Sequence, residues 1–303
     1  MNLCNPRVIR ELMAEAGIKF RRDLGQNFLV DPTIPEEIAD AAAIDAETVI
    51  LEIGPGIGCL TSALAERYRK VLAVEIDRGL IPVLGKTLAA FDNVTVVNDD
   101  CMTADLASLL SCAAGGGVPG VDFPVAVAAN LPYYITTPIL LRLLESGIRF
   151  SRITVMVQKE VADRLAAAPG SKDYGAITAV LGYYGTVERR FTVSPGSFLP
   201  PPAVSSAVVS IDLYPEPKYK PLSEKVFFDT VHAAFEQRRK TLTNALSARF
   251  SDLGKEKIGE IVVSCGFPSD VRGERLGTGD FVTLSDALFL ARNAAGTGFG
   301  EPR

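Results

Sequence analysis

The chain has 303 residues, of which 48% are hydrophobic and 22% are charged, and its formal net charge is −5. This composition excludes a disordered protein, and the length allows a full α/β domain together with a smaller one. No apolar run approaches the length of a membrane span, and the first seven residues lack the apolar core of a signal peptide. A cytoplasmic protein without membrane association is therefore predicted.

The first strong pattern is a strand, a glycine-rich turn and a helix over residues 48–65. Gly54, Gly56 and Gly58 allow the backbone to pass close to a ligand and to adopt positive φ angles. Their spacing differs from the dinucleotide fingerprint G-x-G-x-x-G, and Pro55 lacks an N–H group that a phosphate cradle would use. The turn favours a nucleoside-like ligand without phosphates, with an ordinary tight turn as the alternative.

The next two predicted strands also end in polar side chains. The strand over residues 70–76 carries Glu75 and leads into Asp77, and Glu75 is preferred because it lies nearer the apolar run. A carboxylate at this place in a βαβ unit accepts hydrogen bonds from both ribose hydroxyls, and an ordinary charged turn is the alternative. The strand over residues 94–97 leads into acidic residues that could accept from an adenine amino group, while Met102 could pack on the ring.

Residues 124–129 form an apolar run that predicts a buried strand, and this strand runs into Asn130-Leu131-Pro132-Tyr133. The Asn130 side-chain oxygen and the Leu131 carbonyl can both accept hydrogen bonds from an exocyclic amine. Pro132 fixes the turn and Tyr133 offers a face for stacking, so the pattern suits a base lifted out of its helix. A capped turn is the alternative for these four residues alone. The first three predicted strands, the third of which covers residues 94–97, have polar ends and predict one ligand-binding crevice.

The alternation of strands and helices continues to residue 213 and gives seven strand candidates in all. Gly115 to Gly120 are predicted to form a flexible surface insertion. The remaining predicted elements are helices over residues 137–144, 159–168 and 174–184, and strands over residues 153–158, 187–193 and 204–213.

Prolines at positions 215, 217 and 221 predict a stiff linker, which divides the chain into domains of residues 1–214 and 215–303. Beyond the linker the strand pattern disappears, so the second domain is expected to be small and helical. Its predicted helices lie at about residues 223–234, 238–250, 255–265 and 283–292.

The five cysteines are an odd number without a C-x-x-C pair, and the chain has a single histidine. Neither a disulfide framework nor a zinc site is supported, and no metal is expected. The cysteines are expected to be reduced and structural, although Cys59 and Cys101 fall beside the predicted crevice. His232 lies in a predicted apolar helix with no candidate nucleophile beside it, so a histidine base is not expected.

The net charge argues against binding of nucleic acid by the whole surface, but local basic clusters can still contact phosphates. Each cluster alone is more often a solvated face. The candidates are Lys19 with Arg21 and Arg22, Arg189 with Arg190, and above all Gln237-Arg238-Arg239-Lys240, with Arg249 further on.

A set of motifs in fixed order, from about Lys19 to Leu288, resembles the ribosomal RNA adenine dimethyltransferases, and most closely their small-subunit type. The motifs are Asp23 to Leu29, Gly54 to Gly58, Glu75 to Asp77, Asp100, Asn130 to Ile135, Ser197 to Pro202 and Phe235 to Leu242. Two features depart from the family pattern: Cys59 stands where a small residue is common, and the loop from Gly115 to Gly120 is longer than is typical.

The resemblance implies an α/β fold with a Rossmann-like class I methyltransferase sheet, a small helical C-terminal domain, and S-adenosylmethionine as cofactor. The implied substrate is two adjacent adenines near the 3′ end of small-subunit ribosomal RNA, within the immature subunit, each methylated twice at N6. A monomer is expected. The implied cofactor contacts are Asn27, Leu29, Gly54, Glu75, Asp100 and Asn130. The expected catalytic residues are Asn130, Leu131, Pro132, Tyr133 and Phe198, and the expected RNA contacts are Arg21, Arg22, Arg238, Arg239 and Lys240.

The chemistry of the implied reaction requires positioning above all. The exocyclic amine of adenine is a poor nucleophile because its lone pair is delocalised, and acceptors at Asn130 and Leu131 would draw its hydrogens out of the ring plane. The sulfonium is already an activated leaving group, so alignment rather than a strong base supplies most of the acceleration. Tyr133 and Phe198 are expected to sandwich the flipped base and to offset part of the cost of unstacking.

Two alternatives of different kinds are kept. One is an adenine methyltransferase of large-subunit ribosomal RNA, although Phe198 to Pro202 and the Gln237 to Lys240 segment favour the small-subunit type. The other is a non-catalytic ribosome-assembly factor that uses the fold as a scaffold. The presence of Asn130, Tyr133 and Glu75 argues against a factor without catalytic activity.

Overall fold

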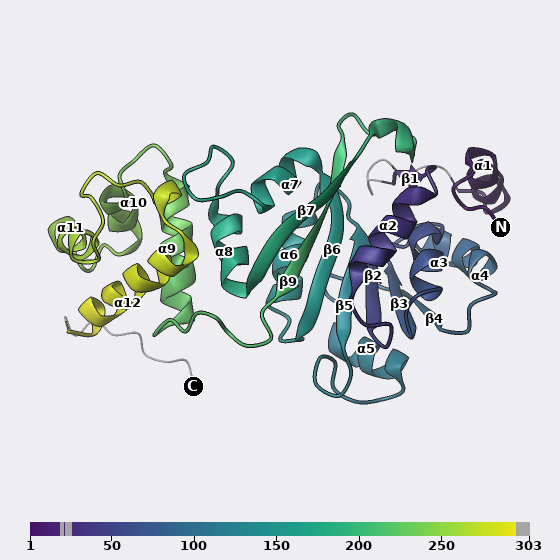
Figure 1. Ribbon diagram of the computed structural model, residues 1–303, viewed down its shortest axis with the longest axis horizontal. Helices are drawn as coiled ribbons and strands as arrows, with labels where there is room; N and C mark the ends of the chain where they lie inside the picture. Colours follow the sequence, from purple (N-terminus) through teal and green to yellow (C-terminus); the bar gives the residue numbers. More distant parts are fainter. Residues whose placement is uncertain (19–20, 22–25, 295–303) are drawn as a thin grey trace. The chain divides into compact units, whose positions relative to one another are not determined.

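Seven strands form one sheet in the computed structural model, which describes residues 1–18, 21 and 26–294 (Figure 1). Their spatial order is β4-β3-β2-β5-β6-β9-β7. The neighbours from β4 to β6 pair in parallel, whereas β9 runs antiparallel to β6. The predicted α/β fold is confirmed, and each predicted strand is present. The strands are β2 (Val49–Ile53), β3 (Lys70–Glu75), β4 (Val94–Asn98), β5 (Val125–Asn130), β6 (Phe150–Gln158), β7 (Gly185–Val193) and β9 (Ser206–Leu213).

The central strands β2 and β5 are buried along almost their whole length. This burial explains why their sequences are continuous apolar runs, since a parallel strand is covered on both faces. Ile53 at the end of β2 lies opposite Val74 in β3 and Ala129 in β5. The carboxyl ends of the three strands are therefore level, and the residues that follow them share one edge of the sheet.

Helices from the segments between the strands pack on this sheet. α2 packs against β5, β6 and β9, and α3 packs against both α2 and β3. The helices of this part of the chain are α1 (Pro6–Glu15), α2 (Thr33–Ala42), α3 (Cys59–Ala65), α4 (Ile81–Thr87), α5 (Leu106–Ala114), α6 (Thr136–Leu144) and α7 (Lys159–Leu165), with 3-10 turns η2 (Arg78–Leu80) and η3 (Pro195–Ser197).

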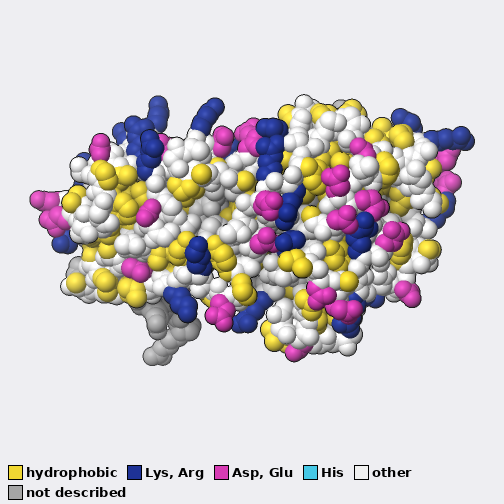
Figure 2. All heavy atoms as spheres, viewed as in Figure 1, with side chains coloured by type: hydrophobic (Ala, Val, Ile, Leu, Met, Phe, Trp, Pro, Cys, Tyr) yellow, Lys and Arg dark blue, Asp and Glu magenta, His cyan; other side chains and the backbone are white. Residues whose placement is uncertain are grey.

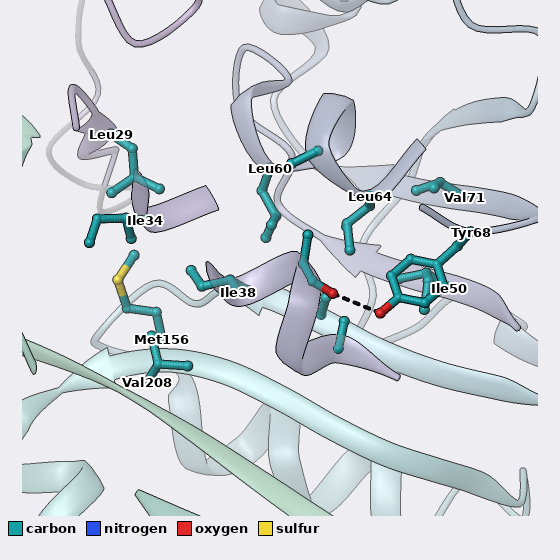
Figure 3. Close-up of a cluster of buried hydrophobic side chains, with 14 of the residues drawn as sticks. Leu29, Ile34, Ile38, Ile50, Leu60, Leu64, Tyr68, Val71, Met156 and Val208 are labelled. Carbon is teal, nitrogen blue, oxygen red and sulfur yellow. Dashed lines mark hydrogen bonds between the residues drawn. The ribbon is translucent and has the colours of Figure 1, made fainter. Parts of the chain in front are cut away.

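A cluster of buried apolar side chains lies between α2, α3 and the sheet (Figure 3). Ile38 and Leu64 are completely buried there, together with Met156 of β6 and Val208 of β9. Tyr68 brings one polar atom into this cluster. Its hydroxyl donates to the Ala39 carbonyl at 2.7 Å and accepts from the Ala43 N–H at 3.0 Å, so that atom is satisfied and secures the end of α2.

The N-terminal segment packs on the same unit through a second apolar cluster. Asn5 caps α1 by accepting from the Arg7 N–H, and α1 then buries Ile9, among other side chains, against Ile57 of the glycine-rich turn. Further along, β1 (Phe28–Leu29) pairs antiparallel with β8 (Phe198–Leu199) in a small separate sheet. Residues from the start of the chain are thus brought to the edge where β2, β3 and β5 end.

The chain divides into two compact units, residues 1–162 with 186–215 and residues 163–185 with 216–303. The second unit takes in residues 163–185, which the linker prolines alone had assigned to the first domain. The prolines mark only the last of three passages between the units. The first falls within α7, where no proline or glycine interrupts the sequence, and the second follows Gly185.

Within the second unit, α9 packs against α8, α10 and α12. Tyr183 anchors the packing, because its ring lies 5.0 Å from that of Phe227 and its hydroxyl donates to Glu224. No helix of the described chain is long and apolar enough to cross a membrane. The elements are α8 (Ala176–Tyr184), α9 (Glu224–Glu236), α10 (Leu242–Arg249), α11 (Lys255–Ser264), α12 (Thr278–Ala294) and the 3-10 turn η4 (Gly273–Arg275).

Tyr68→Phe is expected to lower the free energy of unfolding by about 1–3 kcal/mol, because it leaves a buried N–H without an acceptor. Tyr134→Phe is the matched control, since the Tyr134 side chain is 62% exposed. Urea denaturation of the two variants measures the difference. Equal stability of Tyr68→Phe and the wild type would show that the hydrogen bonds of the Tyr68 hydroxyl do not stabilise the fold.

Candidate functional site

The turn between β2 and α3 has a backbone that only glycine adopts without strain. Gly54, Gly56 and Gly58 have φ angles of +70°, +63° and +94°. Gly54 also donates its N–H to the Val74 carbonyl at 3.0 Å, which ties the turn to the end of β3. A Cβ atom on Gly56 would lie only 3.1 Å from the Phe28 ring, so the turn is packed closely against β1.

Glu75, the last residue of β3, holds this turn in place. One carboxylate oxygen accepts from the Gly56 N–H at 3.1 Å and the other from the Asp77 N–H at 2.8 Å. The side chain is 4% exposed, and its burial raises the pKa of Glu75 while the N–H groups of Asp77 and Gly56 act in the opposite direction. Asp77 has another role, because it accepts from the Gly79 N–H and from the side-chain amide of Gln26.

A pocket opens at the carboxyl ends of β2, β3 and β5. Of the three consecutive strand ends that were predicted to share a crevice, those of β2 and β3 border this pocket, whereas that of β4 does not. The pocket includes every expected cofactor residue except Asp100. The N-terminal arm forms its opposite wall. The lining residues are Gln26, Asn27, Phe28, Leu29, Glu52, Gly54, Pro55, Gly56, Ile57, Cys59, Leu60, Glu75, Ile76, Leu80, Asn130, Pro132 and Tyr134.

The segment from Asn130 to Tyr133 is held by hydrogen bonds on both sides. The Asn130 side-chain amide donates to the Asn27 carbonyl at 3.4 Å, which leaves Oδ1 as the acceptor atom. The Leu131 N–H donates to the Met156 carbonyl at 3.1 Å and fixes the backbone beside β6. The Pro132 carbonyl accepts from the Ile135 N–H and the Thr136 hydroxyl, so the turn continues directly into α6.

The aromatic residues expected around a base are placed differently from one another. The Tyr133 hydroxyl bonds to the Ser206 hydroxyl of β9 at 2.5 Å, and burial raises the pKa of Tyr133. Phe198 is 3% exposed and packs in the core cluster, where β8 pairs it with Leu29. Its stacking on a base stays a prediction and would require the ring to turn out of the core. Tyr134, which is exposed and lines the pocket, was not singled out from the sequence.

Asp100 follows β4 and does not line the pocket. Its side chain accepts from the Met102 N–H at 2.9 Å, and its carbonyl accepts from the N–H groups of Thr103 and Ala104. These bonds shape the loop between β4 and α5. Contact of Asp100 with an adenine amine therefore stays a prediction.

Glu52 is a pocket residue that the sequence reading missed, because it stands within the apolar run of β2. It is 1% exposed, and burial raises the pKa of Glu52 to about 8. The nearby Glu75 charge acts in the same direction. The nearby Thr61 hydroxyl acts to lower the pKa of Glu52. Among the described residues, however, neither Thr61 Oγ1 nor Glu52 Oε2 has a hydrogen-bond partner. A carboxyl inside a buried strand was the available sequence signal.

The expected RNA contacts fall in separate places. Arg239 and Lys240 are exposed in the turn between α9 and α10, where helix α10 begins later than predicted. Arg238 instead donates to the carbonyls of Lys172 and Tyr174, which is a structural role within the helical unit. The Arg21 backbone N–H donates to the Gln26 side chain, and Arg22 lies outside the described residues.

Acidic and basic side chains are interspersed on the face shown in Figure 2.

His232 is exposed on α9. In the part of the chain that the structure describes, no group of three His, Cys, Asp or Glu side chains could hold a metal ion.

Residues 17–261 match the family model described as ribosomal RNA adenine dimethylase. The chain belongs to this family. The predicted resemblance is confirmed, and so is the predicted enzyme class at the level of the family.

Relatives with similar sequences align with this chain over nearly its whole length. Ribosomal RNA small subunit methyltransferase A of Streptococcus pneumoniae is 43% identical over 290 residues, covering 95% of this chain and 98% of that protein. The protein of the same name in Streptococcus gordonii is 44% identical with the same coverage.

Two solved structures support the fold class. A dimethyladenosine transferase from Plasmodium falciparum has a TM-score of 0.72 and 25% identity, covering 88% of this chain and 98% of its own. The 23S rRNA methyltransferase ErmE has a TM-score of 0.65 and 25% identity, covering 86% and 99%. The predicted class I methyltransferase fold is confirmed.

Glu52→Gln is expected to change how stability depends on pH. Because folding raises the pKa of Glu52 from 4.5 to about 8, the folded state binds the proton more tightly, and wild-type stability falls as pH rises between these values. The free energy of unfolding should fall by roughly 1.4 kcal/mol for each pH unit between the two pKa values, and the amide variant should not show this fall. Urea denaturation at several pH values, with exposed Glu47→Gln as the control, measures this. Parallel pH profiles for wild type and Glu52→Gln would contradict the burial of a neutral carboxyl.

Proposed function

We propose that the chain transfers methyl groups from S-adenosylmethionine to N6 of two adjacent adenines near the 3′ end of small-subunit ribosomal RNA. The observation that carries the proposal is the pocket in which Gly54, Glu75 and Asn130 meet at level strand ends. Family membership supports the reaction class. The streptococcal relatives, named for the small subunit and similar over 95% of the chain, support the substrate.

The pocket fits the adenosine part of S-adenosylmethionine better than a nucleotide. Pro55 supplies no N–H, and the Gly56 N–H is already engaged by Glu75, so the turn offers little to a phosphate. Glu75 would hold the ribose, because each of its oxygens accepts one backbone N–H and keeps a second lone pair. Exposed Ile76, which lines the pocket, offers an apolar surface to the adenine.

The protein's part in the chemistry is to orient the target amine. The bond from the Asn130 amide to the Asn27 carbonyl presents Oδ1 as an acceptor, and the Leu131 backbone is fixed by Met156. Two acceptors held in this way would turn the N6 hydrogens out of the ring plane and expose the nitrogen lone pair. The cofactor supplies an activated methyl group, so positioning is sufficient and no strong base is required.

The second methylation sets a further requirement on this site. After the first transfer the amine has one hydrogen left, so only one of the two acceptors can still be used. The remaining orientation must come from packing on the base. Tyr134 is exposed and lines the pocket, and Tyr133 is anchored to Ser206, so these two rings are our candidates for this packing.

We further propose that the substrate is the RNA of an immature small subunit, bound by a monomer in the cytoplasm. Exposed Arg239 and Lys240 would contact phosphates, together with Arg21 and Arg22 of the N-terminal arm. The likeness to ErmE keeps large-subunit RNA as a second candidate. Higher identity to the small-subunit enzymes, over almost their entire length, favours the first.

Asn130→Ala is expected to lower methyl transfer by about 100-fold or more, because it removes one of two acceptors aimed at the amine, while RNA binding is retained. The assay uses labelled S-adenosylmethionine and unmethylated small subunits, with mass spectrometry to locate dimethyladenine. Exposed Asn244→Ala in α10 is the control. Full activity of Asn130→Ala would exclude its role. Label in large-subunit RNA would favour the second candidate, and subunit binding without label would favour an assembly factor.

Replacing Arg239 and Lys240 together by Ala is expected to weaken RNA binding and to reduce the slope of log K against log salt by about 1 per lost phosphate contact. Cofactor binding should not change. Filter binding over a range of salt concentrations measures the slope, with exposed Lys257→Ala in α11 as the control. An unchanged slope would show that this turn does not contact phosphates.

A further inference from the structure

Two cysteines far apart in the sequence meet at the edge of the pocket. Cys59 is the first residue of α3, lines the pocket, and donates its thiol to the Leu3 carbonyl at 3.3 Å. That carbonyl belongs to the peptide bond leading into Cys4, so the Cys59 sulfur lies directly beside the Cys4 backbone. The thiols also affect each other, since their interaction lowers the pKa of Cys4 and raises that of Cys59.

The contact is built into the packing of the N-terminal segment. Leu3 and Cys4 are 7% and 8% exposed, and Leu3 packs in the apolar cluster that contains Ile57 and contacts Cys59. The Cys4 N–H is satisfied by the Asn2 side chain at 3.1 Å, which helps to fix the backbone there. The beginning of the chain is therefore held against the glycine-rich turn, with one thiol on each side.

We propose that Cys4 and Cys59 form a reversible disulfide that ties the start of the chain to the rim of the pocket. The oxidant is a peroxide. The Cys4 thiolate attacks a peroxide oxygen, giving a sulfenic acid and, with hydrogen peroxide, one water. The Cys59 sulfur then displaces the sulfenic oxygen, which leaves with a proton as a second water. The two sulfurs together lose two electrons, and a dithiol reductant reverses the step.

The disulfide would act on the pocket through geometry. An S–S bond of about 2.05 Å is much shorter than a contact between free thiols, so the bond draws the Cys59 and Cys4 sulfurs toward each other. Cys59 lines the pocket and is the first residue of α3, directly after Gly58, so a shift of Cys59 displaces the start of α3 and the pocket wall beside it. The oxidised chain therefore has a displaced pocket wall and binds S-adenosylmethionine about tenfold more weakly, a consequence that rests on the proposed function.

The test begins with a peptide map that does not depend on activity. The full chain is treated with hydrogen peroxide, free thiols are alkylated, and a non-reducing digest is analysed by mass spectrometry. A peptide linking Cys4 to Cys59 is expected; it should disappear with dithiothreitol and in Cys4→Ser, and persist in Cys112→Ser, which changes an exposed cysteine. Oxidation at Cys112 without the linked peptide would overturn the proposal.

Calorimetric titration with S-adenosylmethionine tests the consequence. Oxidised wild type should bind about tenfold more weakly than reduced wild type, whereas Cys4→Ser should bind equally before and after peroxide. Equal binding by cross-linked and reduced wild type would overturn the effect on the pocket. If reduced protein does not bind the cofactor at all, the proposed function fails, and the peptide map still decides whether the thiols pair.

Discussion

The candidate site depends on the in-register parallel pairing of β2 with β3 and β5. This register places Ile53 level with Val74 and Ala129, so the next residue of each strand reaches the same edge. Side chains alternate along a strand, and a shift of β3 by one position would turn Glu75 to the opposite face. The buried apolar runs stabilise this sheet, and the polar residues at their ends determine what it can bind.

Glu75 links the sheet to the glycine-rich turn through its bond to the Gly56 N–H. The protonation state of the neighbouring Glu52 affects the electrostatic environment of that bond. A buried carboxylate is costly, but the N–H groups of Gly56 and Asp77 offset part of the cost. A second charge at Glu52 would oppose that arrangement through repulsion. The raised pKa of Glu52 keeps it largely neutral near pH 7, so it adds little charge beside Glu75.

Local patterns in the sequence were sufficient to predict the strands, the glycine-rich turn and the approach of the β2 and β3 ends to one pocket, whereas the end of β4, also predicted there, does not line it. Features that depend on distant segments were not predictable in this way. Phe198 is expected to stack on the base, and its burial in the core cluster, where β8 pairs with β1, depends on segments far apart in the sequence. Residues 163–185 join the helical unit through packing on α9, for which a single sequence carries no local signal. The hydrogen bond from the Met102 N–H to the Asp100 side chain also depends on the folded shape of the loop, and no local sequence pattern predicted it.

The N-terminal arm completes the pocket by contacting the strand ends themselves. The Gln26 amide donates to Asp77 after β3, and the Asn27 carbonyl accepts from Asn130 at the end of β5. The same short segment therefore forms a wall of the pocket and orients the Asn130 amide, which is proposed to hold the target amine. A ligand that packs against Asn27 would also restrict Asn130, so under the proposed function binding of the cofactor and alignment of the base would be coupled through this one side-chain hydrogen bond. Residues outside the sheet therefore belong to the candidate site as much as the strand ends do.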